Sequence, residues 1–370
     1  MRHDKLCLNY SALRKGVVYS DMRTLFWDDD LHELRMIDQR RLPASLELCA
    51  LHSLVDVAEA IQNMTVRGAP AIGAAAAFGM ALAANESRAH SVAQFLSDLD
   101  IAAHTLKTSR PTAVNLAWAV ERVSQVVHAA TGSLDDLRAL VLAEAQRIAT
   151  EDVAINKRMG EHGSLLIDDG DTILHHCNTG ALAAVDWGTA LGVIRMAHEQ
   201  GKHVHVLVDE TRPRLQGSRL TAWELGQYGI PYEIISDNMA GYFLRSGQVQ
   251  KVLFGADRIA ANGDVANKIG TYMLALAAHD NAVPVYSVAP TSSIDLSLAN
   301  GTLISIEERD PEEVLGIQFH GERVVPEGAK ARNPAFDVTP NHLITAIVTE
   351  NGIIRPPFDV NLQKVFKGPN

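Results

Sequence analysis

A cysteine and an aspartate stand where the sequence could support acid–base or nucleophilic chemistry. Cys177 lies in HHCNTGALA, between an expected strand and the start of an expected helix, where free amides and the helix dipole favour a thiolate. Asp257 ends the apolar run KVLFGAD, and a carboxylate at the end of a buried strand is expected to have a raised pKa and to act as a general acid. The ordinary alternatives are a buried structural cysteine and an aspartate that caps a turn.

Two segments of the first half have the composition of anion-binding loops. VRGAPAIG, residues 66–73, places Arg67 and Gly68 ahead of a helix of small residues, with Pro70 in its first turn. TSRPTAVNL, residues 108–116, repeats this arrangement with Arg110. Outward-facing amides at a helix start, together with an arginine, suit a phosphate. Each arginine alone is also compatible with an ordinary surface position.

Two segments of the second half could bind the same anion. DETRPRLQGSRLTAWEL, residues 209–225, places Gln216 just before a helix start, and its three arginines could neutralise phosphate or pair with Asp209 and Glu210. Asn267 and Lys268 are expected at the start of another helix, where a lysine can bind a phosphate or hold a carboxylate. A solvated lysine is the alternative.

Two regions that differ in composition and in predicted secondary structure must position these residues. We expect domains over residues 1–150 and 151–370. The first is rich in alanine and reads as mostly helical, with short β-like runs at Gly16–Tyr19 and Thr24–Trp27 that predict a small sheet. Its expected helices are Ser53–Met64, Ala71–Ala84, Ser91–Thr105, Ala113–Ala130 and Leu134–Lys157.

From about Asp171 strands alternate with helices, which predicts an α/β fold with a Rossmann-like, doubly wound parallel sheet. The expected strands are Thr172–Cys177, His203–Val208, Tyr232–Ser236, Lys251–Ala256 and Val283–Val288. Ligands bind outside the carboxyl ends of such strands. The strand ends carry Cys177, Asp209, Asp237 and Asp257, so these side chains are expected along one edge.

Composition and absent motifs exclude several classes of partner and cofactor. Lysine and arginine total 33 against 44 aspartate and glutamate residues, a net charge of −11, which disfavours nucleic acid and anionic membranes as partners. No apolar run is long enough for a membrane span, and the N-terminus has no apolar signal region. Three sparse cysteines favour the cytoplasm. GxGxxG, GxxxxGK[ST] and HExxH are all absent, so no nucleotide cofactor and no metal is expected.

Six segments together resemble one family. VRGAPAIG, SRPTAVNL, HCNTGALA, DETRPRLQGSRLTAWEL, GADRIAANGDVANKIGTY and NPAFDVTP occur in this order. They resemble the methylthioribose-1-phosphate isomerases, which are members of the family that also includes the regulatory subunits of translation initiation factor 2B. The resemblance implies a smaller, mostly helical N-terminal domain, a Rossmann-like domain and a homodimer. It also implies that Cys177 and Asp257 are catalytic and that the substrate is bound by Arg67, Gly68, Ala69, Arg110, Gln216, Asn267 and Lys268.

The activity implied by the resemblance is the aldose–ketose isomerisation of 5-methylthioribose 1-phosphate to 5-methylthioribulose 1-phosphate in methionine salvage, without a cofactor. Two alternatives stay open. One is an isomerase of 5-deoxyribose 1-phosphate or ribose 1,5-bisphosphate, which differ from that substrate at C5. The other is a non-enzymatic regulatory subunit related to initiation factor 2B, which would not need the Cys177 and Asp257 pair.

Overall fold

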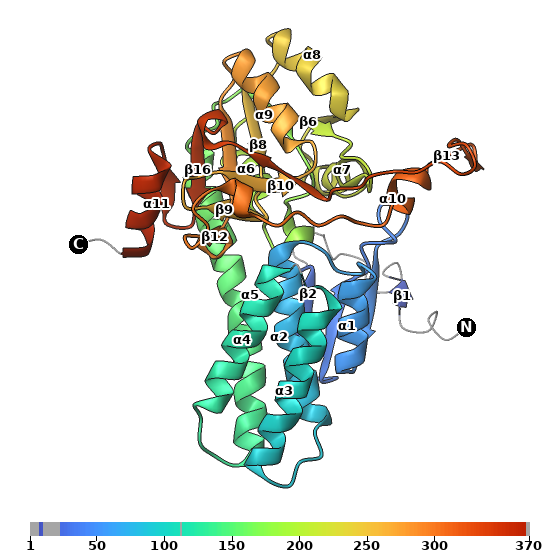
Figure 1. Cartoon of the computed structure of the whole chain (residues 1–370), viewed down its shortest axis with the longest axis vertical. Helices are drawn as coiled ribbons and strands as arrows, with labels where there is room; N and C mark the ends of the chain where they lie inside the picture. Colours follow the sequence, from blue (N-terminus) through green and yellow to red (C-terminus); the bar gives the residue numbers. More distant parts are fainter. Residues whose placement is uncertain (1–6, 10–22, 112, 368–370) are drawn as a thin grey trace. The chain divides into compact units, whose positions relative to one another are not determined.

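The computed structural model describes residues 7–9, 23–111 and 113–367, and the expected run Gly16–Tyr19 lies outside them. The chain divides into two compact units (Figure 1). The first unit is Met1–Asn156 with Gly180–Gly188, and the second is Lys157–Thr179 with Thr189–Asn370. Each unit is described by itself. Among the described residues, no helix has both the length and the apolar content of a membrane span.

The first unit combines long helices with a small antiparallel sheet. The sheet has the order β1-β4-β3-β2. Its strands are β1 Cys7–Asn9, β2 Leu25–Asp28, β3 Glu33–Ile37 and β4 Glu47–Leu51. The helices are α1 Leu54–Gln62, α2 Ala69–Glu86, α3 Val92–Ser109, α4 Val114–His128 and α5 Leu134–Ser164, the last of which continues into the second unit. The five expected helices are therefore confirmed, with ends shifted by a few residues.

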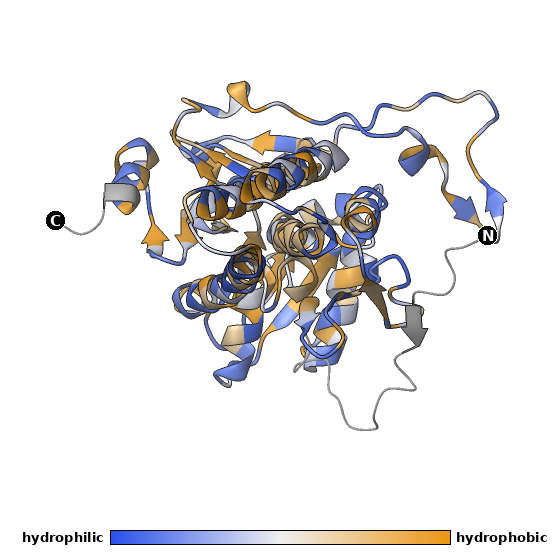
Figure 2. Ribbon diagram, turned by 90° about the horizontal axis from the view of Figure 1, so that it is seen from below, coloured by the Kyte–Doolittle hydropathy of each residue, from blue (hydrophilic) through white to orange (hydrophobic). Residues whose placement is uncertain are grey.

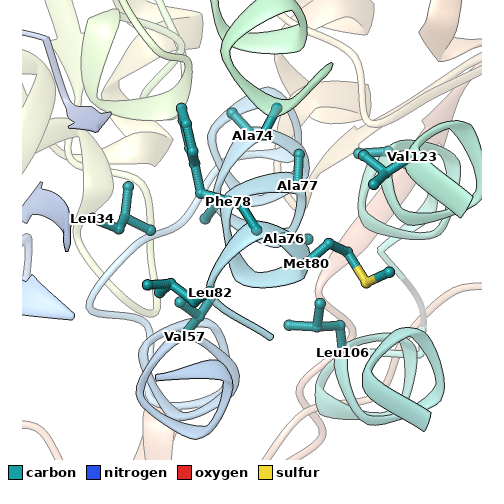
Figure 3. Close-up of a cluster of buried hydrophobic side chains, with 14 of the residues drawn as sticks. Leu34, Val57, Ala74, Ala76, Ala77, Phe78, Met80, Leu82, Leu106 and Val123 are labelled. Atoms are coloured by element: carbon teal, nitrogen blue, oxygen red, sulfur yellow. The ribbon is translucent and has the colours of Figure 1, made fainter. Parts of the chain in front are cut away.

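Helix α2 forms the centre of this unit. Every residue from Ala71 to Ala84 is buried, and α1, α3 and α4 all pack against it (Figure 3). Alanine and glycine allow this close approach, because a Cβ at Gly79 would lie 3.1 Å from side-chain carbons of both Val57 and Leu106. Phe78 supplies the largest apolar side chain of the helix and lies 5.9 Å from the Trp27 ring. An all-round apolar helix is a core helix.

Local sequence signals explain where two of these helices begin. The Ser53 side chain accepts a hydrogen bond from the Asp56 amide, and Asp56 caps the Ser53 amide in return. Ser91 caps α3 in the same way through the Gln94 amide. Both serines were expected as first helical residues, and both lie just outside their helices.

The second unit is built on a seven-stranded sheet of order β17-β16-β11-β8-β5-β6-β7. All neighbours run parallel except the pair of β16 and β17. The strands are β5 Thr172–His175, β6 His205–Asp209, β7 Tyr232–Ile235, β8 Lys251–Phe254, β11 Val285–Val288, β16 Ala346–Thr349 and β17 Gly352–Ile354. The Rossmann-like fold class is confirmed, and the antiparallel edge strand was not predicted.

The strand order reverses direction between β5 and β8. From β5 the chain moves outward through α6 Ala190–Glu199 to β6 and through α7 Ala222–Tyr228 to β7. From β8 it moves the other way, through α9 Thr271–Asp280 to β11. Right-handed crossovers in opposite directions place helices on opposite faces, and α8 Ala240–Arg245 packs on α9. The reversal between β5 and β8 is the switch point at which open α/β sheets bind ligands.

A second sheet and an extended segment complete this unit, and neither was predicted. The sheet has the order β12-β9-β10-β15, with β9 Arg258–Ala260, β10 Val265–Lys268, β12 Ile294–Asp295 and β15 Phe336–Thr339. The extended segment carries α10 Glu312–Leu315 and the exposed hairpin of β13 Gln318–Phe319 and β14 Glu322–Arg323, which Figure 2 draws largely in the hydrophilic colour. Helix α11 Phe358–Lys367 is the last described element.

Candidate functional site

Four neighbouring parallel strands end along one edge of the large sheet. Their register pairs His175 of β5 with Leu253 of β8 and with Val208 of β6. Cys177 lies two residues beyond the end of β5, and Asp257 lies three beyond the end of β8. The sequence prediction that strand-end side chains gather at one edge is therefore confirmed for these strands, with β5 and β8 flanking the switch point.

Backbone contacts hold Cys177 in an unusual conformation. Its φ of +69° lies in the left-handed region, which a residue with a side chain seldom adopts. The Cys177 amide donates to Thr211 Oγ1 at 2.9 Å, and its carbonyl accepts from Thr221 Oγ1 at 2.7 Å. Both threonines are fully buried, and Cys177 is 6% exposed. A strained backbone that its surroundings hold in place is typical of functional positions.

The expectation that Cys177 stands at a helix N-terminus is wrong. The alanine-rich run after it forms only the single 3-10 turn Ala181–Ala183, and α6 begins at Ala190. Tertiary contacts within the first unit account for this, because the Ala181 and Leu182 carbonyls accept hydrogen bonds from the side chains of Thr24 and Gln39. These side chains take carbonyls that a helix would use internally, so local helix propensity is overridden.

Asp257 is joined to its surroundings on two sides. Its amide donates to the carbonyl of Ala266 in β10 at 2.9 Å. Two residues earlier, a Cβ at Gly255 would lie 2.9 Å from Cγ2 of Thr179, so the turn after β8 packs on the loop that carries Cys177. The loops with the thiol and the carboxylate are therefore in direct contact within the second unit.

The prediction that Asn267 and Lys268 start a helix is wrong, because both lie in strand β10 and α9 begins three residues later. Strand β10 pairs with β9 on one side and with β15 on the other, which single-sequence periodicity did not reveal. Asn267 Nδ2 donates to Thr271 Oγ1 at 3.0 Å. Lys268 Nζ donates to the Ala335 carbonyl at 2.6 Å and lies 4.5 Å from the Phe336 ring centre. Both side chains are buried, so neither is an ordinary solvated residue.

Gln216 is brought to the same edge by the residue that follows it. A Cβ at Gly217 would lie 1.7 Å from the Asp209 carbonyl oxygen, so only glycine permits this approach to the end of β6. Gln216 is buried, and its Oε1 has no hydrogen-bond partner in the described part of the chain. A buried acceptor left open in this way is expected to bind a ligand or water.

The arginines of this segment have other partners than expected. Arg214 pairs with Glu313 at 2.8 Å, and Arg212 donates to the Val314 carbonyl at 3.2 Å. The predicted pairing with Asp209 and Glu210 is therefore wrong for these two arginines. Both partners lie in α10, about a hundred residues along the chain, and no local sequence pattern predicted these contacts.

A buried pair that sequence reasoning missed lies beside the thiol. His176 Nδ1 is 2.8 Å from Asp209 Oδ2, and His176 Nε2 is 3.0 Å from the Ile269 carbonyl. Burial raises the pKa of Asp209 to about 6, against the opposing effect of His176. Burial lowers the pKa of His176, but Asp209, together with Asp237 and the Ile269 carbonyl, outweighs this effect and holds the pKa above its usual value. The sequence did contain a signal for this pair, because His176 directly precedes Cys177 and Asp209 ends the neighbouring strand β6.

Asp237 adds a second carboxylate beside this pair. Atoms of His176, Asp209 and Asp237 lie within 4.8 Å of one another, which is the spacing of a metal site. The protein already uses most of these atoms, because Asp237 accepts hydrogen bonds from the amides of Thr211 and Arg212 at 2.7 and 2.8 Å. We assign no ion to this cluster.

Asn178 continues the framework behind the thiol. Its Nδ2 donates to Glu224 Oε1 at 2.8 Å and to Thr221 Oγ1 at 3.2 Å. Glu224 and Thr221 are fully buried in the helical segment after Gln216. The Asn178 side chain therefore fixes the loop behind the thiol.

The expected substrate-binding residues of the first unit surround the start of α2 and the end of α3. Gly68 has a φ of +92°, and a Cβ there would lie 2.3 Å from the Ala183 carbonyl oxygen, so only glycine fits. Ala69 begins α2, Arg67 precedes the glycine, and Arg110 follows the last residue of α3. All four residues are partly buried.

A model of the initiation factor 2 subunit family matches residues 65–356. The chain belongs to this family. It is 53% identical over 346 residues to a protein of Geobacter metallireducens named methylthioribose-1-phosphate isomerase, covering 93% of this chain and 99% of the relative. A Synechococcus protein of the same name is 50% identical over 350 residues, covering 95% and 99%.

Solved structures of this family share the fold. A structure described as 5-methylthioribose 1-phosphate isomerase from Pyrococcus horikoshii has a TM-score of 0.88 at 46% identity, covering 94% of this chain and 96% of the other. One described as translation initiation factor eIF-2B, subunit delta, from A. fulgidus has a TM-score of 0.84 at 44% identity, covering 94% and 99%. Family members similar to this chain therefore carry both an enzymatic and a translational name.

Proposed function

We propose that this chain isomerises 5-methylthioribose 1-phosphate to 5-methylthioribulose 1-phosphate, a step of methionine salvage. The observation that carries the proposal is the pair of contacting loops at the switch point, one bearing Cys177 and the other Asp257. A regulatory subunit does not require a thiol and a carboxylate at the ligand-binding edge. An isomerase requires groups that move protons there.

The reaction is difficult because phosphate on the anomeric oxygen blocks spontaneous ring opening. In the proposed mechanism Asp257, protonated, donates to the ring oxygen as it leaves, and a hydrogen then moves from C2 to C1. Cys177 either carries this hydrogen as a proton through an enediolate or assists the hydroxyl protons while hydride shifts. General acid–base assistance of this kind contributes roughly 10²–10⁴-fold.

Substrate binding in the proposal uses the residues that the family resemblance implies. Gln216 is buried beyond the end of β6, and Asn267 and Lys268 are buried in β10, whose Ala266 carbonyl accepts from the Asp257 amide. In the proposal Lys268 supplies a positive charge for an anionic substrate. Arg67, Gly68, Ala69 and Arg110 of the first unit are proposed to bind the phosphate. A homodimer and a cytoplasmic location also belong to the proposal.

The deciding experiment is turnover of methylthioribose 1-phosphate by the purified protein with no added cofactor. Parallel assays with 5-deoxyribose 1-phosphate and ribose 1,5-bisphosphate test the group at C5, and preferred turnover of either would replace the proposed substrate. Solvent deuterium found at C1 of the product supports proton transfer, and its absence supports hydride transfer. No turnover of any of the three would contradict the proposal.

A second function is favoured by the structure from A. fulgidus that is named as a translation initiation factor subunit. A regulatory subunit of this kind would form a stable complex with other factor subunits and show no isomerase activity. Affinity purification of the full chain from its own cells, combined with the turnover assay on the same preparation, separates the two functions.

A further inference from the structure

One buried imidazole ties together three segments of the second unit. We propose that His176 is a positioning residue of the isomerase site, bonded to Asp209 through one ring nitrogen and to the Ile269 carbonyl through the other. The first bond fixes the end of β5 against the end of β6, at 2.8 Å, and the second fixes it against the turn after β10, at 3.0 Å. This inference rests on the proposed function.

The positions of these bonds link them to the two parts of the site. His176 directly precedes Cys177, and Ile269 directly follows Lys268. The ring is also packed against backbone, because Gly270 has a φ of +103° and a Cβ there would lie 2.9 Å from His176 Cε1. The imidazole therefore sets the thiol-bearing loop relative to the strand that carries Asn267 and Lys268.

The charged and titratable groups around the ring are mostly carboxylates. Asp337 caps the start of α9, accepting from the amides of Gly270 and Tyr272 at 2.8 and 3.1 Å. The groups that interact electrostatically with His176 or its partner Asp209 come from β5, the ends of β6 and β7, and β15, and they are His175, Glu210, Asp237 and Asp337. Lys268 of β10 acts on Asp337. His175 stays neutral beside His176, since burial and then His176 lower its pKa to about 3.

Keeping both bonds requires one shared proton. A carbonyl only accepts, so Nε2 must carry hydrogen to bond the Ile269 oxygen. The contact between Nδ1 and Asp209 then holds either an imidazolium with a carboxylate or a neutral ring that accepts from a carboxylic acid. When that proton leaves, the ring has one hydrogen for two acceptors, and one of the two bonds is lost. Positioning is therefore expected to weaken at alkaline pH.

Two substitutions separate the bonds. His176→Asn keeps an amide donor near the place of Nδ1 and loses the bond to Ile269, whereas His176→Gln keeps a donor near Nε2 and loses the bond to Asp209. The matched control is His203→Asn, since His203 also contacts an aspartate, Asp169, at 3.0 Å but lies exposed on the surface. Folding of each variant is checked by circular dichroism and thermal unfolding.

The expected results differ between the variants. His176→Asn raises KM by about tenfold with a smaller change in kcat, because the strand of Asn267 and Lys268 loses its tie. His176→Gln lowers kcat by about tenfold with a smaller change in KM, because the thiol loop loses its tie. His203→Asn changes neither. A general loss of folding would not produce this division between KM and kcat.

Asp209→Asn tests whether hydrogen bonds or charge matter. An amide can donate to Nδ1 while Nε2 still donates to Ile269, so both bonds survive without a shared proton. We expect Asp209→Asn to lose much less activity than His176→Gln and to abolish the part of the alkaline decline in rate that this pair causes. Should both His176 variants fail to fold, this variant and its pH profile decide alone.

A readout that does not require turnover keeps this inference separate from the proposed function. The rate at which iodoacetamide alkylates Cys177, identified by peptide mass spectrometry, is expected to rise at least about threefold in both His176 variants and not in His203→Asn. If the natural protein turns over no substrate while alkylation follows this pattern, only the function is contradicted. Kinetic constants within about twofold of the natural protein in both His176 variants, or Asp209→Asn as damaging as His176→Gln, overturns the positioning role.

Discussion

The core around α2 and the edge at Cys177 are both buried, but by opposite kinds of side chain. Residues 71–84 of α2 are buried and almost wholly apolar, with small side chains at the close approaches. At the edge the buried groups include His176, Asp209 and Glu224, each with a specific hydrogen-bond partner. Apolar packing is non-directional and favours folding, whereas polar burial is favourable only when each partner is in place. We therefore expect the first region to govern stability and the second to govern the proposed chemistry.

The largest expected effect lies in the apolar core. Phe78→Ala removes a fully buried ring that stacks with Trp27, and large-to-small substitutions of this kind lower the free energy of unfolding by about 3–5 kcal/mol. Urea unfolding measures the loss. Ile101→Ala on α3, where the side chain is 64% exposed, is the matched control and is expected to change stability by less than about 0.5 kcal/mol. Equal losses of stability in both variants would contradict the claim that buried packing around α2 governs stability.

Next in size are the two proposed catalytic groups. Cys177→Ser and Asp257→Asn are each expected to lower kcat by at least about 10²-fold, since each removes a group that transfers a proton, while the unfolding midpoint stays close to that of the natural protein. Steady-state kinetics with methylthioribose 1-phosphate, together with thermal unfolding, measures both. Near-normal turnover in either variant would remove that residue from the mechanism.

A smaller effect is expected from the framework behind the thiol. Thr221→Val deletes the hydroxyl that donates to the Cys177 carbonyl and accepts from Asn178, at nearly unchanged volume. Leaving a buried carbonyl without its donor costs about 1–3 kcal/mol, and kcat is expected to fall several-fold as the loop relaxes. Urea unfolding and steady-state kinetics of this variant show whether the contacts around Cys177 affect activity more than the packing around α2 does. A stability loss with unaltered kcat would show that the loop geometry is not needed for turnover.

The smallest effect concerns a carboxylate of the first unit. Burial raises the pKa of Asp152 to about 7, even though its side chain accepts from the Val185 amide at 2.8 Å. The folded state therefore holds a proton that the unfolded state releases above about pH 4, and the free energy of unfolding falls as pH rises from 4 toward 7.

Asp152→Asn removes this titration and is expected to stabilise the protein by about 1 kcal/mol at pH 8 and by nothing at pH 4. The gain at pH 8 is small because the residue keeps some solvent contact, which lowers the cost of its charge. Urea unfolding at the two pH values measures the difference. A gain of the same size at both pH values would rule out the titration as its cause.

Sequence patterns predicted the elements whose cause is local. Alanine-rich composition predicted the helices of the first unit, and the alternation of strands with helices predicted the parallel sheet. Because the direction of parallel strands fixes where their ends lie, the same pattern predicted that Cys177 and Asp257 share an edge. The roles of these two residues came from resemblance, since position alone left a structural cysteine and a capping aspartate open.

Patterns failed where distant partners compete with local propensity. Asn267 and Lys268 were predicted in a helix and lie in a strand, because β9 and β15 pair with β10 on either side. The run after Cys177 was predicted as a helix, and its carbonyls bind side chains more than a hundred residues away. His176 was not singled out, because both of its partners lie far along the chain.

The amino-acid sequence by itself determined which segments are helices or strands through their own periodicity, and hence which side chains leave the carboxyl ends of parallel strands. Only the tertiary structure decided the left-handed backbone at Cys177, the burial of Lys268 and the bonds of His176. The physical reason is that hydrogen bonds and burial depend on groups brought together by folding. Their energies can exceed the fraction of a kilocalorie per mole by which most residues differ in local propensity.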